Sequence, residues 1–222
     1  MPKLGDIYIA DISCLQDKKL FAGQLAALSA ERQRKVMAMA SEKNRCLTAG
    51  AGVLLNVALR KYGIDGKTAK ICYNIYGKPF LHDYHIYFSL SHSGDYVFCA
   101  VSDEEIGADI QRHTNYKQNV VKRFFHPAEQ AYISSLSLNK RATTFFRLWT
   151  LKESCAKMLG TSLAKTLSSV SVQFTAQAIV AHANGQKLPC TFNEYNLDGY
   201  SAAVCSKKEG QAEPLQWVEL TE

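Results

Sequence analysis

The sequence predicts an α+β protein built from two similar α/β halves, residues 1–105 and 106–222. Two long helical patterns end at glycines that lie 97 positions apart, and short strand-like runs follow each. The segments GDYVFCAVS at 94–102 and DGYSAAVCS at 198–206 also resemble each other, each opening on a Gly/Asp turn. Because antiparallel hairpins rather than βαβ crossovers follow each helix, a duplicated unit explains this spacing better than one doubly wound sheet.

The two long helices are predicted from their caps and apolar spacing. Ser41 can cap the first helix, and Gly63 is placed to end it in a left-handed conformation. The second helix begins after Asn139 and meets Gly160 as its terminator. The apolar faces comprise Leu47, Val53, Leu54, Val57 and Ala58 in the first helix, and Phe145, Phe146, Leu148, Trp149 and Leu151 in the second.

Six short apolar runs predict the main strands. Three of them follow each helix, so each half combines one long helix with antiparallel strands. The predicted strands are residues 71–76, 86–90 and 96–101 in the first half, and 170–174, 188–195 and 200–205 in the second.

Composition and charge restrict the class of protein. Hydrophobic residues make up 47% of the 222 residues and charged residues 21%, which excludes disordered, collagenous and coiled-coil chains. The net charge of +6 points to an anionic partner. Positive charge is concentrated in two segments, with a local net charge of +7 between Arg112 and Lys157 and of +5 between Glu31 and Lys61. A solvated helix face is the ordinary explanation of such charge runs.

We expect neither export nor membrane insertion. The N-terminal segment lacks the features of a secretory signal, and the most apolar stretch, residues 48–59, is far below the roughly 20 residues that span a bilayer. The seven cysteines have no CxxC pair and no regular spacing, so they fit neither a disulfide framework nor a zinc site. A cytoplasmic protein with reduced cysteines follows as the expectation.

A possible metal site is indicated by two segments. The signatures GxxxxGKS, GxGxxG, HExxH and GxSxG are missing, which removes support for the common nucleotide, hydride, zinc-protease and hydrolase functions. In IGADIQ, strand alternation puts Asp109 and Gln111 on one side and Ile110 on the other. One carboxylate, one amide oxygen and a second carboxylate would suffice for Mg²⁺. Without that second carboxylate, Asp109 is better explained as an edge-strand acid.

Glu153 is the candidate second carboxylate. In WTLKESCAK, residues Trp149, Glu153 and Lys157 share one helix face at i, i+4 spacing, and Trp149 can anchor its apolar side. Taken alone, Glu153 and Lys157 are better explained as an exposed ion pair, worth about 0.3–0.5 kcal/mol.

The segment SHSG at 91–94 lies between two predicted strands. Its serine hydroxyls, backbone N–H groups and imidazole could bind phosphate oxygens, although such a segment is more often only a hairpin turn. A Ser-His-Asp triad using Ser91 and His92 is disfavoured, because adjacent strand residues point to opposite faces.

In combination, these segments resemble the 4′-phosphopantetheinyl transferases of the surfactin-synthetase-activating (Sfp) type. The resemblance extends over nearly the whole chain, and IGADIQ followed by WTLKESCAK is its most specific part. It implies two similar α/β halves with the active site between them, in agreement with the duplication. The matching segments are SAERQRK at 29–35, GKP at 77–79, SHSG at 91–94, IGADIQ at 106–111, RFFHPAEQ at 123–130 and WTLKESCAK at 149–157.

The resemblance implies that the phosphopantetheine arm of coenzyme A is transferred to a serine of an apo acyl or peptidyl carrier protein. Adenosine 3′,5′-bisphosphate would be released, and Mg²⁺ would be required. The metal positions would be Asp109, Gln111 and Glu153, with Glu153 also a candidate base. Glu129 matches a family acid that serves as base or as support. The coenzyme contacts would be Arg32, Lys35 and Arg45 at the 3′-phosphate, Lys78 beside the coenzyme, Ser91 and His92 at phosphate and nucleotide, and Lys152 and Lys157 at the pyrophosphate.

One departure from the family pattern bears on activity. Many relatives carry glutamate where this chain has Gln111, so a neutral amide stands at the third metal position and would bind metal more weakly or leave a water there. One alternative is therefore an inactive, metal-poor relative. A non-enzymatic basic module for nucleic acid or acidic protein is another, but it gives no reason for Asp109 and Glu153 to accompany GKP and SHSG.

The expected partners are coenzyme A and an acidic carrier protein, with neither nucleic acid nor membrane. Apolar residues of 120–137 could dock the carrier or belong to the core. A chain that holds both halves of its site needs no second subunit, so we expect a monomer. The sequence does not distinguish carriers of fatty-acid, polyketide or nonribosomal-peptide synthesis.

Overall fold

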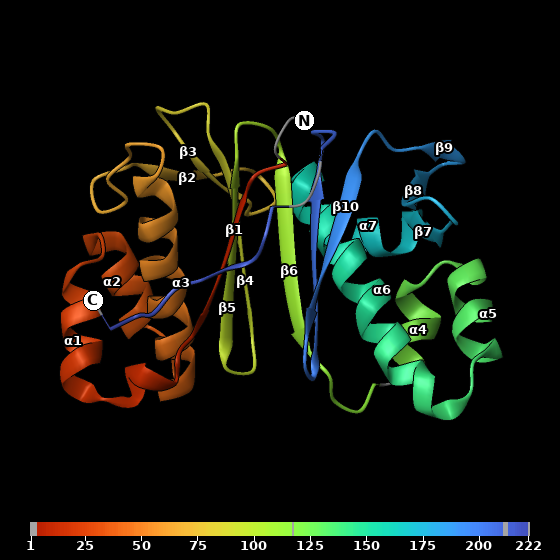
Figure 1. Cartoon of the computed structure of the whole chain (residues 1–222), viewed down its shortest axis with the longest axis horizontal. Helices are drawn as coiled ribbons and strands as arrows, with labels where there is room; N and C mark the ends of the chain where they lie inside the picture. Colours follow the sequence, from red (N-terminus) through yellow and green to blue (C-terminus); the bar gives the residue numbers. More distant parts are fainter. Residues whose placement is uncertain (1–3, 117, 211–212, 222) are drawn as a thin grey trace.

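Two sheets lie at the centre of the molecule, with α1–α3 outside one and α4–α7 outside the other (Figure 1). The computed structural model describes residues 4–116, 118–210 and 213–221. The first sheet has the strand order β12-β1-β5-β4, and the second has the order β10-β11-β6. This arrangement confirms the α+β class.

The first half of the chain supplies β1–β5 and the helices on their outer side. A short 3₁₀ helix, Ser13–Gln16, follows β1. The other elements are β1 (Asp6–Asp11), α1 (Lys18–Ala26), α2 (Ala30–Met37), α3 (Glu42–Arg60), β2 (Ile71–Tyr73), β3 (Pro79–Leu81), β4 (Tyr87–Ser93) and β5 (Tyr96–Ser102).

The second half supplies the other central sheet, the helices outside it and a separate small sheet. A small sheet of order β7-β8-β9 lies beside the helices. The elements are β6 (Ile106–Arg112), α4 (Gln118–Phe124), α5 (Pro127–Ser135), α6 (Leu138–Leu159), α7 (Leu163–Ser169), β7 (Val170–Phe174), β8 (Ile179–Ala183), β9 (Gln186–Lys187), β10 (Thr191–Leu197), β11 (Tyr200–Ser206) and β12 (Gln216–Trp217).

The caps of the long helices agree with the sequence at three of four ends. The Ser41 hydroxyl accepts the N–H of Asn44 at 3.1 Å, and Gly63 has a φ of +70° just beyond α3. Gly160, at φ +63°, ends α6. The predicted start of α6 after Asn139 is wrong, because the helix begins two residues earlier, after Ser137. Asn139 accepts a hydrogen bond from the Ser137 hydroxyl at 2.7 Å instead of capping the helix.

Both faces of the central strands are buried, which explains their nearly continuous apolar sequences. In β5, Val97, Cys99 and Val101 pack in the core beneath α3, whereas Phe98 and Ala100 face the second sheet. The same alternation in β11 separates residues that face α6 from residues that face the first sheet. Those facing α6 are Ala203 and Cys205, and those facing the first sheet are Ala202 and Val204.

The two sheets meet along β4 and β6 through serine hydroxyls. Ser89 Oγ accepts the N–H of Ala108 at 2.9 Å, and Ser93 Oγ accepts the N–H of Arg112 at 2.9 Å. Between them, Ser91 Oγ donates to Asp109 Oδ1 at 2.6 Å. The three serines lie two residues apart, so the pleat points all of them at β6. Side chains therefore fix how the two halves are aligned.

Several strand boundaries differ from those predicted. β2 ends at Tyr73 and β10 begins at Thr191, so both are shorter at one end than expected. The expected SHSG loop is largely the end of β4, and the turn itself comprises Gly94 and Asp95, with Gly94 at φ +61°. The serines are in the strand because their hydroxyls bond β6.

The C-terminal strand returns to the first half. β12 pairs in parallel with β1, and Leu220 is buried in the core beneath α3. Division of the chain at residues 105 and 106 remains a prediction. Among the described residues, no helix combines the length and apolar character required to cross a bilayer.

Of the residues weighed as a docking surface, Phe125 and Ile133 are buried in the second core. The core explanation therefore holds for these two, while Tyr132 is 43% exposed.

Candidate active site

Asp109 is the buried acid at the centre of the site. It lies on β6 on the side that faces α6, while Ile106, Ala108 and Ile110 face the core between the sheets, as strand alternation predicts. Asp109 Oδ1 accepts hydrogen bonds from Ser91 Oγ at 2.6 Å and from Lys157 Nζ at 2.7 Å. Its Oδ2 accepts one from Gln111 Nε2 at 3.2 Å. A carboxylate with no access to solvent is thus held by three side chains.

Gly107 allows α6 to reach β6. A Cβ atom at this position would lie 2.0 Å from the backbone oxygen of Ser154 and 2.3 Å from the backbone nitrogen of Met158. Only hydrogen fits there, since backbone atoms of a helix cannot turn aside as a side chain can. This close approach sets the distance between Asp109 on β6 and the two charged residues Glu153 and Lys157 on α6.

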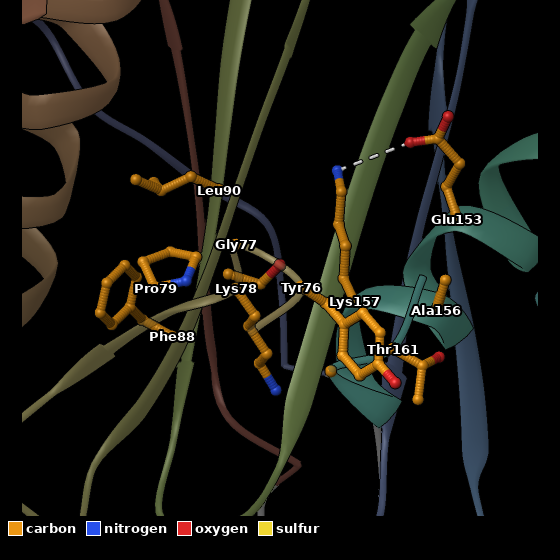
Figure 2. Close-up of a pocket in the computed structure, with 12 residues that line it drawn as sticks. Tyr76, Gly77, Lys78, Pro79, Phe88, Leu90, Glu153, Ala156, Lys157 and Thr161 are labelled. Carbon is orange, nitrogen blue, oxygen red and sulfur yellow. Dashed lines mark ion pairs between the residues drawn. The ribbon is translucent and has the colours of Figure 1, made fainter. Parts of the chain in front are cut away.

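Glu153 and Lys157 complete the charged centre from one face of α6. Lys157 Nζ lies 3.8 Å from Glu153 Oε2 (Figure 2). It also lies 2.7 Å from Asp109 Oδ1, so one ammonium group pairs with two carboxyl groups. Burial, and then the negative charge of Asp109, raise the pKa of Glu153 to about 7. The pair is therefore part of a partly buried triad with Asp109 and not a separate surface ion pair.

The raised pKa of Glu153 predicts how stability depends on pH without divalent metal. Its ordinary pKa is 4.5, so between about pH 4.5 and 7 the folded chain holds a proton that the unfolded chain has lost. The contribution of this group to the free energy of unfolding should fall as the pH rises through that range. Urea unfolding at a series of pH values should show this fall in wild type and lack it in Glu153→Gln. Parallel pH profiles for the two proteins would contradict the prediction.

A cavity of about 390 Å³ opens between the two halves at this triad. Arg32, Lys35 and His92 line it from the first half, and Asp109, Gln111, Glu153 and Lys157 from the second. Burial lowers the pKa of Arg32 and that of Lys35, so an anion beside them would offset the cost of keeping both charged. Cations and carboxyl groups thus line one cavity.

Ser91 and His92 are adjacent on β4 but differ in their exposure to solvent. Ser91 is buried against Asp109, while His92 is exposed, as alternation along a strand requires. Partial exclusion of water from the imidazole, together with Lys157, lowers the pKa of His92. His92 is therefore mostly neutral at pH 7 and can donate or accept a hydrogen bond in the cavity.

Lys78 and Arg45 are engaged by the protein itself. Lys78 Nζ donates to Glu105 Oε2 at 2.6 Å and to the carbonyl of Met158 at 3.0 Å, while Asn74 Nδ2 donates to the carbonyl of Gly160 at 2.8 Å. Lys78 and Asn74 thus bind carbonyl groups at the C-terminal end of α6. Arg45 Nε donates to the carbonyl of Met39 at 2.9 Å.

Lys78 also lines a neighbouring cavity of about 230 Å³, which shares Glu153 and Lys157 with the first (Figure 2). In that view the side chains of Lys78 and Lys157 point in opposite directions. The ammonium group of Lys78 therefore lies away from that of Lys157 and from the carboxyl groups with which Lys157 pairs.

Glu129 and Lys152 form a separate, buried ion pair. Lys152 Nζ lies 2.6 Å from Glu129 Oε2, and the two side chains are 0% and 2% exposed. Glu129 also accepts the N–H of His126 at 2.8 Å, in a capping box at the start of α5, and the N–H of Val172 at 2.8 Å. With both oxygens occupied, Glu129 ties α5, α6 and β7 together. Neither residue lines the cavity that contains Asp109.

Sequence reasoning missed Gly107, Ser89 and Ser93 as determinants of this site. The period of two in FSLSHS was the available signal for the serines, because three hydroxyls on one face of a strand require polar partners. Gly107 gave no comparable signal, since its role depends on a helix some 50 residues further along the chain.

The residues present fit a divalent cation. Asp109 and Glu153 share the single charge of Lys157, and burial together with the negative charge of Asp109 raises the pKa of Glu153. Gln111 donates its amide N–H to Asp109, which leaves its oxygen as a further possible ligand. Two carboxylates and one amide oxygen form a hard donor set of the kind that Mg²⁺ prefers.

Comparison with known proteins decides the family. The 4′-phosphopantetheinyl transferase gsp of Aneurinibacillus migulanus is 30% identical over 86% of this chain and 81% of its own. A 4′-phosphopantetheinyl transferase of Bacillus subtilis is 32% identical over 86% of this chain and 88% of its own. The chain belongs to the 4′-phosphopantetheinyl transferase family.

Two further comparisons locate the likeness along this transferase. The sequence model of the 4′-phosphopantetheinyl transferase superfamily matches residues 105–205, which include β6 and α6. A crystal structure of Thermotoga maritima holo-[acyl-carrier-protein] synthase aligns with 46% of the chain at a TM-score of 0.39 and 17% identity, too partial a likeness to extend the comparison. Membership of the transferase family removes the support for a non-enzymatic basic module.

Proposed function

We propose that this transferase moves the 4′-phosphopantetheine arm of coenzyme A to a serine hydroxyl of an apo acyl or peptidyl carrier protein, with Mg²⁺ required and adenosine 3′,5′-bisphosphate released. The cavity between the halves carries the proposal, because it combines the two carboxyl groups of Asp109 and Glu153 with cations suited to phosphate groups. Asp109 and Glu153 would hold the metal, with Gln111 as the weaker third position. When bound there, Mg²⁺ would neutralise charge on the pyrophosphate.

The cations divide into two groups along the cavity. Arg32 and Lys35 lie on the first half and suit the 3′-phosphate, since burial leaves their charges short of compensation. Lys157 lies on the second half and suits the pyrophosphate, and His92 can hydrogen-bond a phosphate or the nucleotide. Arg45, Lys78 and Lys152 are held by other protein groups, so we assign them to supporting these elements.

Glu153 is the better of the two candidate bases. Its carboxyl group lines the cavity in which the acceptor serine would attack, so it can accept the serine proton there. Glu129 has both oxygens committed to Lys152 and to backbone N–H groups, which suits a supporting role. The serine proton would therefore pass to Glu153 in the step that releases the bisphosphate.

We further propose a cytoplasmic monomer of two halves, 1–105 and 106–222, that binds no nucleic acid and no membrane. Residues of both halves line the same cavity, which supports a site contained in one chain. An acidic carrier would be attracted by the net charge of +6.

Mass spectrometry of an apo carrier protein incubated with the transferase, coenzyme A and Mg²⁺ tests the function. The mass of phosphopantetheine should be added to the carrier, and adenosine 3′,5′-bisphosphate should appear in equal amount. A carrier whose acceptor serine is replaced by alanine is the control. Absence of the mass increment with several unrelated apo carriers, at concentrations where the chain is folded, would overturn the proposal.

Gln111→Glu should lower the Mg²⁺ concentration needed for half-maximal activity several-fold, because a charged oxygen replaces a neutral one beside Asp109. Gln173→Glu, at an exposed position of β7, is the matched control for added charge. Magnesium titrations of carrier loading provide the measurement. An unchanged titration in Gln111→Glu would place this residue outside the metal site.

A further inference from the structure

Three of the seven cysteines meet in the second half, although they are far apart in the sequence. The Sγ atoms of Cys155, Cys190 and Cys205 all lie within 4.8 Å of one another. Cys155 comes from α6, Cys205 from β11 and Cys190 from the residue before β10. The absence of a regular spacing therefore did not exclude a thiol cluster, because the fold brings the three together.

The fold points these thiols inward for identifiable reasons. Cys205 lies on the face of β11 that packs against α6, and Cys155 lies on the inner side of α6. β10 pairs with β11 so that Phe192 stands opposite Cys205, which brings Cys190 to the same end of the hairpin. Cys155 and Cys205 are 0% exposed, whereas Cys190 is only partly buried.

The distances suit a thiolate-bound metal. Three sulfurs at the 4.8 Å limit would lie about 2.8 Å from a common centre, against a Zn–S bond of about 2.3 Å. A shift of about 0.5 Å by each sulfur would close the site, which is within the reach of small χ1 changes. The partly exposed Cys190 leaves a route from solvent, and a water would take the fourth position.

We propose that Cys155, Cys190 and Cys205 form a binding site for a thiophilic d¹⁰ cation, with Zn²⁺ as the representative ion. Each thiol that coordinates the ion releases its proton to solvent, and no oxidation is involved. Soft sulfur ligands and the absence of carboxylates from the cluster distinguish it from the Asp109 and Glu153 site, whose oxygen ligands suit Mg²⁺.

The three thiols differ in acidity. Hydrogen bonds from Cys155 and Cys205 lower the pKa of Cys190, whereas the hydrogen bond with Cys190 raises the pKa of Cys155 and burial raises that of Cys205. A bound cation would therefore have to displace the protons of Cys155 and Cys205. The charge of Lys187 acts to lower the pKa of Cys190, and that of Lys152 acts to lower the pKa of Cys155. Three thiolates around one Zn²⁺ leave a net negative charge, and these two ammonium groups would offset part of it.

The proposed ion would also tie the site-bearing helix to the second sheet. Cys155 is two residues from Glu153 on α6, while Cys190 and Cys205 belong to the β10–β11 hairpin. Occupancy is thus expected to raise the melting temperature of the chain as well as to occupy the thiols.

Equilibrium dialysis against Zn²⁺ in excess Mg²⁺ and reductant tests the site, because Mg²⁺ keeps the carboxylate site occupied. Wild type should bind one Zn²⁺ per chain, and Cys190→Ser should bind it at least about 10-fold more weakly. The matched control is Cys72→Ser, a partly buried cysteine on β2 that should bind like wild type. Zn²⁺ should raise the melting temperature of wild type and Cys72→Ser more than that of Cys190→Ser.

A second measurement does not depend on any variant folding. Cd²⁺ added to wild type should produce a thiolate-to-metal charge-transfer band of the intensity expected for three thiolates, unaffected by excess Mg²⁺. Lack of this band, equal Zn²⁺ affinity in wild type and Cys190→Ser, or a disulfide within the cluster that forms in place of metal uptake under reductant would each overturn the proposal.

Discussion

Asp109→Ala is expected to abolish carrier loading while the chain stays folded. The substitution removes the buried carboxylate that accepts hydrogen bonds from Ser91, Lys157 and Gln111 and that would hold the metal. Loss of several kcal/mol of charge stabilisation corresponds to a rate reduced by about 10³-fold or more. Glu153→Gln should reduce the rate similarly, because it removes the second carboxylate and the candidate base without a change in size.

Asp103→Ala is the matched control for this loss. Asp103 is an acid whose side chain is 61% exposed and pairs with Lys208, so its removal should leave the rate near wild type. Carrier loading followed by mass spectrometry gives the rate, and circular dichroism with thermal unfolding checks the fold. Wild-type rates in a folded Asp109→Ala or Glu153→Gln chain would refute the assignment of the site.

Gly107→Ala should impair both stability and transfer, although its side chain would be a single methyl group distant from any substrate. That methyl would lie 2.0 Å from Ser154 O and 2.3 Å from Met158 N, so α6 must move away from β6. Overpacking of this kind costs about 1–3 kcal/mol, and the shift would separate Glu153 and Lys157 from Asp109. We expect a rate reduced by about 10²-fold, since positioning errors near 1 Å have effects of that size.

Gly23→Ala distinguishes this steric effect from the general consequence of replacing glycine. Gly23 lies in α1, and a Cβ atom there meets no atom within 4 Å, so alanine should stabilise the helix by up to about 1 kcal/mol. Urea unfolding and carrier loading of both variants make the comparison. Equal stability of Gly107→Ala and wild type, with undiminished transfer, would show that α6 does not depend on the missing side chain.

The arrangement of the first half shows how far local periodicity reaches. Ser41 and Gly63 marked the ends of α3. The continuous apolar run at 96–101 predicted β5, and both faces of that strand are buried. Local pattern failed at Asn139, because its side chain accepts the Ser137 hydroxyl and the helix begins two residues before the predicted start. Caps compete among neighbouring polar residues, and spacing alone does not decide the competition.

The sequence predicted the face of the strand or helix on which each residue of the carboxyl site lies. It did not predict which of these residues contact one another. Strand alternation put Asp109 opposite Ile110, and helical spacing put Glu153 and Lys157 together. The two patterns do not specify that Lys157 bonds Asp109 at 2.7 Å, because that contact requires β6 and α6 to touch at Gly107.

By itself the sequence determined the α+β class, the family resemblance and the face on which each charged residue lies, since these follow from short-range order along the chain. The tertiary structure alone decided which faces meet. It paired Glu129 with Lys152 away from the cavity and gathered Cys155, Cys190 and Cys205 around one point. The physical reason is that a periodic pattern fixes a side chain's direction within its own element, whereas its partner depends on packing between elements distant in sequence.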